Sequence, residues 1–347
     1  MSIVKRTSLS LYDDDEEEET VAEPVSKKSK QDSPPLLTPP SDSNESSTQS
    51  SSKDTSSSVL PSPKRVILSV LGARKGERAE MEDTHVSISC LPSHQVPIIS
   101  RISLYAIFDG HAGARASRYC EDNLPKTMSK LIAQHRTVDS LEKGMKKLFI
   151  DTYKNVDDAF LKEARVNKPA WKDGTTATTL LVLDDTVYTA NIGDSKGIVC
   201  RKKDGKDCII QLTVDHNPVN FEERQRISKA GGVVKNGRID GIIEVSRSIG
   251  DGHFKTRGVT CIPDIKKFSL TPDDKFILIA CDGLWKSFSN EEAVEFVWKL
   301  LKDSETKEEV MEGGEKSQWE WVASEMAAEA VRRRCGDNVS VLILVLR

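Results

Sequence analysis

Apolar runs of strand length recur along the chain from residue 66 onward, and this recurrence constrains the fold most strongly. The runs are rich in Val, Ile, Leu and Thr and end at Gly, Asp or Asn, as buried strands followed by turns do. They cover 66–71, 85–90, 102–108, 177–183, 186–192, 208–213, 275–281 and 338–346, and helical periodicity covers about 113–133, 139–165, 220–230, 290–302 and 318–334. Strands and helices do not alternate one-to-one. We therefore predict an α+β fold of antiparallel sheets with helices packed outside.

Residues 1–64 differ in composition from the rest of the chain. They include an unbroken run of acids from Asp13 to Glu19, and residues 33–63 contain 12 Ser, 3 Thr and 6 Pro. Such a segment cannot bury enough apolar surface to offset the entropy of ordering its backbone. We therefore predict a disordered tail over 1–64 and a folded domain over 65–347.

Short motifs in this tail have two explanations each. Ser33, Thr38 and Ser62 each precede a proline, which fits proline-directed phosphorylation or, equally well, chance in a Ser/Pro-rich linker. The lysine cluster at 27–30 is explained first as a solvated basic patch and second as a weak nuclear import signal.

Charge and cysteine content narrow the classes of partner and compartment. The formal net charge is -4, divided into −5 for residues 1–64 and +1 for residues 65–347. This balance predicts no broad nucleic-acid or membrane binding, and no apolar run reaches the roughly 20 residues of a membrane helix. The 7 cysteines form no CxxC pair, and the N-terminus lacks the apolar stretch of a signal peptide. We expect reduced thiols in a cytoplasmic or nuclear protein.

Acids stand at the ends of several of the apolar runs. Asp-Gly occurs six times, and its ordinary meaning is a turn. Strands that are apolar throughout are buried on both faces, so carboxylates at their ends must be paired, protonated or metal-bound. The acids in such positions are Asp109, Asp194, Asp282 and Asp337. Oxygen ligands without clustered His or Cys favour Mg²⁺ or Mn²⁺, although ordinary turns and helix caps explain the spacing at least as well.

Seven short motifs follow one another along the folded part. They are RAEMEDTH at 78–85, FDGHAG at 108–113, GTTA at 174–177, GDS at 193–195, VSRSIGD at 245–251, CDGLW at 281–285 and DNVSV at 337–341. Together they resemble the metal-dependent Ser/Thr protein phosphatases of type 2C, the PPM family, over residues 65–347. The resemblance implies a four-layer sandwich of two antiparallel β-sheets flanked by α-helices, with metal ions at one edge between the sheets.

The resemblance also implies ligands for two Mg or Mn ions. Asp109 matches the acid that bridges both ions, and the Gly110 carbonyl matches a further ligand. Asp282 and Asp337 match the remaining protein ligands of the second ion. Two cations a few ångströms apart lower the pKa of a bridging water, and the resulting hydroxide attacks phosphorus in line without a phosphoenzyme.

Three further acids match positions with supporting roles. Glu82 and Asp83 match residues that hold metal-bound waters. Asp194, together with Asp282, matches the ligands of a third, weaker ion that some members of the family bind, and this role stays open.

Arg78 and His111 match the family's phosphate-binding arginine and its proposed general acid. A planar guanidinium holds two phosphate oxygens at once, and a histidine titrates near the pH of catalysis. From the residues alone, a surface arginine near Glu77 and Glu80 is the preferred interpretation of Arg78. His111 as a turn residue bonded to a carboxylate is compatible with the catalytic role.

The segment from His216 to Lys255 matches the family's flap beside the catalytic cleft. We expect its basic residues to steer phosphopeptides: Arg224, Arg226, Lys229, Lys235 and Arg238. A solvated helix face explains Arg224 to Lys229 equally well. Lys286 departs from the pattern, because many relatives carry an Asp there, and this cation weakens a third metal site or alters the approach of substrate.

These observations predict a Mg/Mn-dependent phosphatase that acts on phosphoserine and phosphothreonine in proteins. The alternative is a pseudophosphatase that binds phosphoproteins or a kinase without turnover, which Lys286 and the acidic tail motivate. A nucleic-acid module has little support, because the body shows no basic-aromatic interleaving. We expect a monomer, and a finer resemblance within the family implies a kinase-containing complex as a partner.

Overall fold

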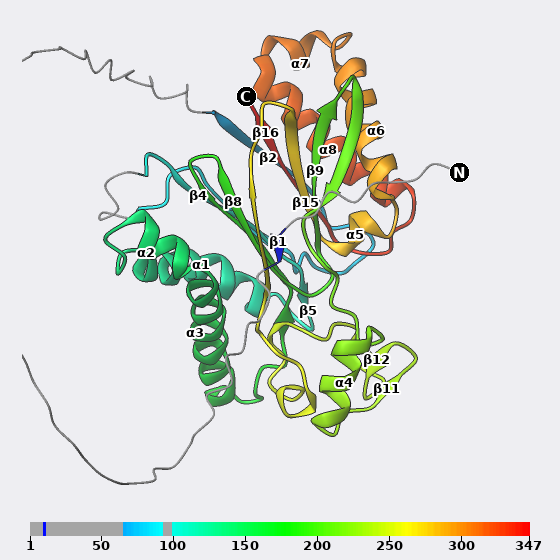
Figure 1. The fold of residues 1–347 in the computed structure, drawn as a ribbon. Coiled ribbons are helices and arrows are strands. Elements are labelled where there is room, and N and C mark those ends of the chain that lie inside the picture. The colour runs from blue at the N-terminus through cyan, green and yellow to red at the C-terminus, as the bar shows by residue number, and fades with distance from the viewer. Residues whose placement is uncertain (1–9, 12–64, 93–98) are drawn as a thin grey trace, which may run out of the picture. The chain divides into compact units, whose positions relative to one another are not determined.

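The computed structural model describes residues 10–11, 65–92 and 99–347. The predicted tail over 1–64, with its Ser/Thr-Pro sites and lysine cluster, lies outside the described residues apart from Ser10–Leu11. The domain boundary at residue 65 therefore stays a prediction. Figure 1 shows the arrangement of the sheets and helices.

Six strands form the first antiparallel sheet in the order β1-β14-β8-β7-β4-β3. They are β1 (Ser10–Leu11), β3 (Thr84–Ile88), β4 (Ile102–Phe108), β7 (Ala177–Leu183), β8 (Thr186–Ile192) and β14 (Asp264–Ser269). β4, β7 and β8 have the bounds that the apolar runs predicted. β4 and β7 are buried along their whole length, because both faces of the sheet are covered.

Five strands form the second antiparallel sheet in the order β10-β9-β15-β16-β2. They are β2 (Ile67–Arg74), β9 (Lys196–Lys203), β10 (Lys206–Gln211), β15 (Asp274–Ala280) and β16 (Val339–Leu346). β16 lies between β15 and β2, and Ile343 pairs with Leu278 on one side and with Val70 on the other.

Helices cover the outer face of each sheet, which completes four layers (Figure 1). On the first sheet, α1 (Arg115–Ile132) and α3 (Met145–Val166) contribute Leu124 and Phe149 to a core shared with Phe108. On the outer face of the second sheet pack α6 (Asn290–Ser304) and α8 (Gly314–Arg332). Tyr105 and Ile279 meet in a third core between the sheets. Successive strand residues therefore alternate between two apolar cores, which explains the unbroken apolar runs.

Two small sheets lie beside the sandwich. β5 (Gly110–His111), β6 (Gly174–Thr175) and β13 (Ile249–Gly250) form one of them, and they join three sequence-distant motifs. The hairpin of β11 (Val234–Lys235) and β12 (Arg238–Ile239) lies next to α4 (Phe221–Lys229) in the segment predicted as the flap (Figure 1).

The structure adds elements that the sequence patterns did not predict. β9 and β14 are strands despite their lysines, and the helix predicted over 139–165 is two helices, α2 (Val138–Lys143) and α3, separated at Gly144. The short helices α5 (Asp282–Trp285), α7 (Glu308–Glu312) and η1 (Lys255–Arg257) are also new.

All 7 cysteines are among the described residues and are free thiols, four of them buried. Within the same part of the chain, no helix has the length and apolar character needed to cross a membrane.

Candidate active site

Four strand ends bring acidic side chains together. Asp109 follows β4 and Asp194 follows β8, both in the first sheet. Asp282 follows β15 and Asp337 precedes β16, both in the second sheet. The predicted acids therefore come in equal number from the two sheets, at the edge where the sheets meet.

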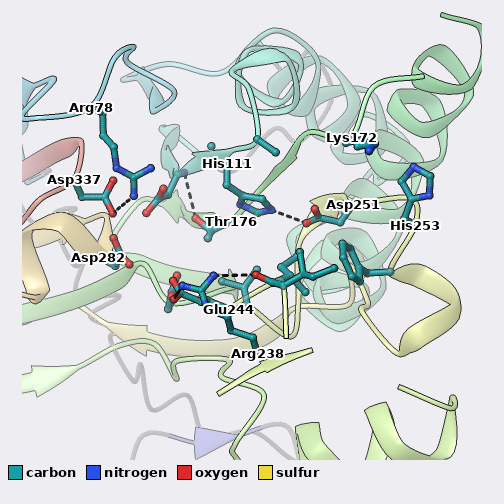
Figure 2. A pocket seen from close by; sticks show the side chains of 18 of the residues that line it. Arg78, His111, Lys172, Thr176, Arg238, Glu244, Asp251, His253, Asp282 and Asp337 are labelled. Atoms are coloured by element: carbon teal, nitrogen blue, oxygen red, sulfur yellow. Dashed lines mark hydrogen bonds and ion pairs between the residues drawn. The ribbon is translucent and has the colours of Figure 1, made fainter. Parts of the chain in front are cut away.

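These acids line one pocket with a volume of about 530 Å³. Figure 2 shows Arg78 and Asp337 at one end of the pocket, His111 near its middle, and Lys172 and His253 at the other end. The pocket thus extends well beyond the acids, along a wall that the flap contributes.

Asp109 lies centrally among the acids. Its carboxylate oxygen and those of Asp194 and Asp282 lie within 4.8 Å of one another. Asp109, Asp83 and the thiol of Cys281 form a second group within the same limit. Burial raises the pKa of Cys281 well above its usual value, and the charges of Asp83 and Asp109 raise it further. The thiol therefore stays protonated, and the oxygen atoms are the donors suited to a hard cation.

Burial and neighbouring negative charges raise the pKa of three of the acids, Asp83, Asp109 and Asp194. Burial raises the pKa of Asp109 well above its usual value, and the charges of Asp83 and Asp282 add to the effect. Burial and then Asp282 raise the pKa of Asp194 to about 7. Burial raises the pKa of Asp83 to about 6, against a hydrogen bond from Ser340. Asp83 Oδ1 is buried and has no hydrogen-bond partner among the described residues. These features fit a divalent cation, which offsets such repulsion.

Gly110 and Glu82 lie beside the acids in different ways. Gly110 lines the pocket, and a Cβ on it would lie only 2.3 Å from the Glu82 carbonyl oxygen, so the two backbones are in close contact. The Glu82 amide donates a hydrogen bond to Asn338 Oδ1 (2.8 Å), and the Glu82 carbonyl accepts one from Ser117. The Glu82 carboxylate belongs to neither acidic group, so a direct contact with an ion at Asp109 is not indicated.

Two cations contact Asp337. An Arg78 guanidinium nitrogen lies 3.0 Å from Asp337 Oδ2, and Arg78 Nε donates to the carbonyl of Gly336 (3.2 Å). Lys286 Nζ lies 2.8 Å from the same Asp337 oxygen and 2.7 Å from Asp282 Oδ2. Burial acts to lower the pKa of Lys286, but Asp282 and Asp337 outweigh it and raise that pKa, so the side chain is an ammonium at neutral pH.

His111 is held by a buried acid from the flap side of the pocket. Its Nε2 lies 2.7 Å from Asp251 Oδ2, which also accepts a hydrogen bond from Ser248 (2.6 Å). Burial acts to lower the pKa of His111, but the charge and hydrogen bond of Asp251 outweigh it, and the pKa is raised. Gly174 makes room for the pair, because a Cβ there would lie 2.1 Å from Asp251 Oδ2 and 2.4 Å from His111 Nε2. His111 is therefore bonded to a carboxylate, as its alternative interpretation expected, but it lies in strand β5 and not in a turn.

Comparison with known proteins identifies the family. The sequence profile described as "Protein phosphatase 2C" matches residues 68–339. The chain belongs to the protein phosphatase 2C family. An integrin-linked kinase-associated serine/threonine phosphatase 2C of Bos taurus is 44% identical over 287 residues, which cover 80% of this chain and 77% of the relative. A probable protein phosphatase 2C 8 of Arabidopsis thaliana is 35% identical over 286 residues, or 79% and 77% of the two chains.

Solved structures confirm the phosphatase 2C fold. The serine-threonine phosphatase 2C of Toxoplasma gondii aligns with a TM-score of 0.64, at 20% identity, over 82% of this chain and 100% of that chain. The sandwich predicted from the motifs is therefore correct.

Several residues of the phosphatase 2C pocket were missed by sequence reasoning. Asp251 was assigned to an ordinary Asp-Gly turn, and it does have the positive φ of a turn residue (51°), but its carboxylate binds His111. Thr176 appeared in the GTTA motif without a functional role, and its hydroxyl accepts a hydrogen bond from the Asp109 amide (3.2 Å). The signal available for both was their place in the quoted motifs.

Asn338 also fixes the site from a position that sequence reasoning left unassigned. Its side-chain amide donates to the carbonyl oxygens of Lys75 (2.7 Å) and Glu80 (3.0 Å). These bonds fasten the loop that carries Arg78 to the start of β16, beside Asp337.

Two of the flap's basic residues, Arg226 and Arg238, have different surroundings. Arg226 is bound to the buried Glu223 together with Arg247, so it serves the structure of the flap. Arg238 lines the pocket and pairs with Glu244. The expectation that flap cations steer phosphopeptides therefore does not fit Arg226, and it stays a prediction for Arg238.

Proposed function

We propose that this chain is a Mg/Mn-dependent protein serine/threonine phosphatase. The observation that carries the proposal is the convergence of Asp109, Asp194 and Asp282, with carboxylate oxygens within 4.8 Å, in a pocket of a protein phosphatase 2C. Membership of the family supports hydrolysis of phosphoproteins, and the clustered acids support dependence on a divalent metal.

Asp109, Asp282 and Asp337 would hold the two ions, with the Gly110 carbonyl as a further ligand. Asp194 would share a third, weaker ion with Asp282, and the presence of its carboxylate in the same group supports this role. When bound, Mg²⁺ or Mn²⁺ supplies an activated water and offsets the charge of the phosphate.

Glu82 and Asp83 have supporting roles toward the ions. Ser340 donates to Asp83 Oδ2 (2.8 Å), which orients the carboxyl and leaves the buried Oδ1 without a hydrogen-bond partner among the described residues. Glu82 would act through water, since its carboxylate stands outside both acidic groups. The hydrogen bond of the Glu82 amide to Asn338 holds the Glu82 backbone in place.

Arg78 and His111 act on the substrate. Arg78 is half exposed at the pocket and can turn its guanidinium from Asp337 to two phosphate oxygens. His111 donates a proton to the leaving serine or threonine oxygen. Asp251 binds His111 Nε2, so Nδ1 is the nitrogen left for this transfer, and Asp251 stabilises the imidazolium before the proton leaves.

The test is hydrolysis of a phosphothreonine peptide by the full chain with Mn²⁺, with a chelator, and after Asp109→Asn. We expect turnover with Mn²⁺ and none with the chelator or in the variant. Equal rates in all three samples would refute the proposal.

One observation favours the second candidate, a pseudophosphatase. Lys286 places an ammonium on both Asp282 and Asp337, where a metal ligand set is expected. Tight binding of the phosphothreonine peptide at saturating Mn²⁺ without phosphate release would establish this candidate and exclude the first.

Partners and location extend the proposal. The Bos taurus relative is named for association with integrin-linked kinase, and we propose a kinase-containing complex for this chain as well. We further propose that the chain is a cytoplasmic or nuclear monomer. The tail over 1–64 would lie outside the catalytic domain, which agrees with a family match that begins at residue 68.

A further inference from the structure

Lys286 occupies an unusual position between two acids of the site. Its Nζ lies 2.7 Å from Asp282 Oδ2 and 2.8 Å from Asp337 Oδ2, and its side chain is 43% exposed. One ammonium therefore joins the acid that follows β15 to the acid that precedes β16.

The backbone around Lys286 fixes this arrangement. Lys286 follows α5 one turn after Asp282, and its amide donates to the Asp282 carbonyl (2.8 Å), so the side chain folds back over that acid. A Cβ on Gly283 would lie 2.0 Å from the Asn338 carbonyl oxygen, which shows how closely α5 packs against the segment that carries Asp337. Trp285 Nε1 donates to the Ala280 carbonyl (3.0 Å) and anchors the end of α5.

An ion held by both carboxylates would need the same space. Mg²⁺ binds oxygen at about 2.0–2.1 Å, so an ion that bridges two oxygen atoms lies between them, close to where the ammonium now lies. Lys286 contacts Oδ2 of both acids, and two cations cannot share these atoms without strong repulsion. The ammonium must move before Asp282 and Asp337 bind one ion together.

Arg78 does not play the same part. Its guanidinium contacts Asp337 but is also fixed by the carbonyl of Gly336, and no contact with Asp282 is formed among the described residues. Removal of Lys286 would therefore take away the ammonium contact of Asp282 and one of the two cationic contacts of Asp337, while the contact with Arg78 stays.

We propose that Lys286 is a tethered competitor of the divalent metal. It neutralises Asp282 and Asp337 in the metal-free protein and is displaced when an ion binds to both acids, so it sets the metal concentration at which the site fills. This inference rests on the proposed metal-dependent function, and it concerns the strength of metal binding rather than its existence.

The test is calorimetric titration of the full chain with Mn²⁺, comparing the wild type with Lys286→Met, which keeps most of the length of the side chain and removes the charge. Lys143→Met is the matched control, because Lys143 also pairs with the acid four residues before it, Asp139 (3.0 Å), on an exposed helix. We expect Mn²⁺ to bind Lys286→Met about 10-fold more tightly, and Lys143→Met to equal the wild type. The rise in melting temperature caused by Mn²⁺ should also be larger in Lys286→Met.

Asp109→Asn assigns the binding to this site, and Lys286→Gln replaces Lys286→Met if the latter fails to fold. An Asp109-dependent Mn²⁺ affinity that is unchanged or weaker without Lys286 overturns this inference and leaves the proposed function standing. Absence of Asp109-dependent Mn²⁺ binding in the wild type overturns both.

Discussion

His111 Nε2 lies 2.7 Å from Asp251 Oδ2, across 140 residues of sequence, and this pair links strand β5 to the residue that follows strand β13. Asp251 raises the pKa of His111 and binds its Nε2, so Nδ1 is left for proton transfer. If His111 donates a proton to the leaving group, its loss should slow substrates with a basic leaving group more than substrates with a weakly basic one.

His111→Ala should slow hydrolysis of a phosphothreonine peptide by about 10²- to 10³-fold, because an alkoxide leaving group needs a proton. Hydrolysis of p-nitrophenyl phosphate, whose leaving group is a weak base, should fall far less. Steady-state rates on both substrates at saturating Mn²⁺ check this. An equal loss on both would show that His111 acts in another way.

Gly174→Ala should disrupt the His111–Asp251 pair without contacting the proposed metal ligands Asp109, Asp282 and Asp337. The added Cβ would lie 2.1 Å from Asp251 Oδ2 and 2.4 Å from His111 Nε2, so one of the two side chains must move. We expect kcat on the phosphopeptide to fall by about 10- to 100-fold with unchanged Mn²⁺ affinity. Gly252→Ala is the control, since its Cβ would meet only the end of Leu161, at 3.1 Å. Full activity of Gly174→Ala would contradict the role given to the pair.

Glu223→Ala should destabilise the flap strongly. Glu223 is buried and binds the guanidinium groups of Arg226 and Arg247, each with a closest N–O distance of 2.7 Å. Its removal leaves both cations without this partner, at a cost of about 3 kcal/mol in the free energy of unfolding. Urea unfolding measures this cost, and the exposed neighbour Glu222→Ala should change the free energy by less than about 0.5 kcal/mol. Similar values for the two variants would show that the network contributes little.

Asp264, which binds Arg247 and His216, should make the free energy of unfolding depend on pH in the acid range. Burial acts to raise the pKa of Asp264, but the His216 hydrogen bond and the Arg247 charge outweigh it and lower that pKa from 3.8 to about 2. A lowered carboxyl pKa contributes stability that is complete above the unfolded value and is lost as the pH falls through the folded value. The difference in unfolding free energy between wild type and Asp264→Asn should therefore shrink between about pH 4 and pH 2. A difference that stays constant over this range would argue against a charged Asp264 in the native protein.

The sandwich could be predicted because its central strands have apolar side chains facing cores on both sides. β4, β7 and β8 are of this kind, and their apolar runs begin and end where the strands do. β14 carries Lys266 and Lys267 and, within the described part of the chain, pairs on its outer side with the two-residue β1, so its pattern is not that of a core strand. β9 ends in three basic residues at the exposed end of its sheet.

The acids of the site could be predicted for the same reason, since Asp109 and Asp282 end buried strands. The contacts that other side chains make within the site could not be predicted. Asp251 has the sequence and the backbone of an ordinary turn, and only the tertiary fold places its carboxylate on His111. Lys286 could be recognised as a departure from the family, but its position on both Asp282 and Asp337 follows from the packing of α5 against β16.

The most direct test of the account is a parallel titration of the full chain with Mn²⁺, in which bound metal and phosphate release from a phosphothreonine peptide are measured in the same samples. We predict that turnover rises with metal occupancy in the wild type, and that Asp109→Asn shows neither Asp109-site binding nor turnover. Turnover in Asp109→Asn, or turnover in the wild type after complete removal of metal by a chelator, would contradict the claim that the acids around Asp109 form a catalytic metal centre.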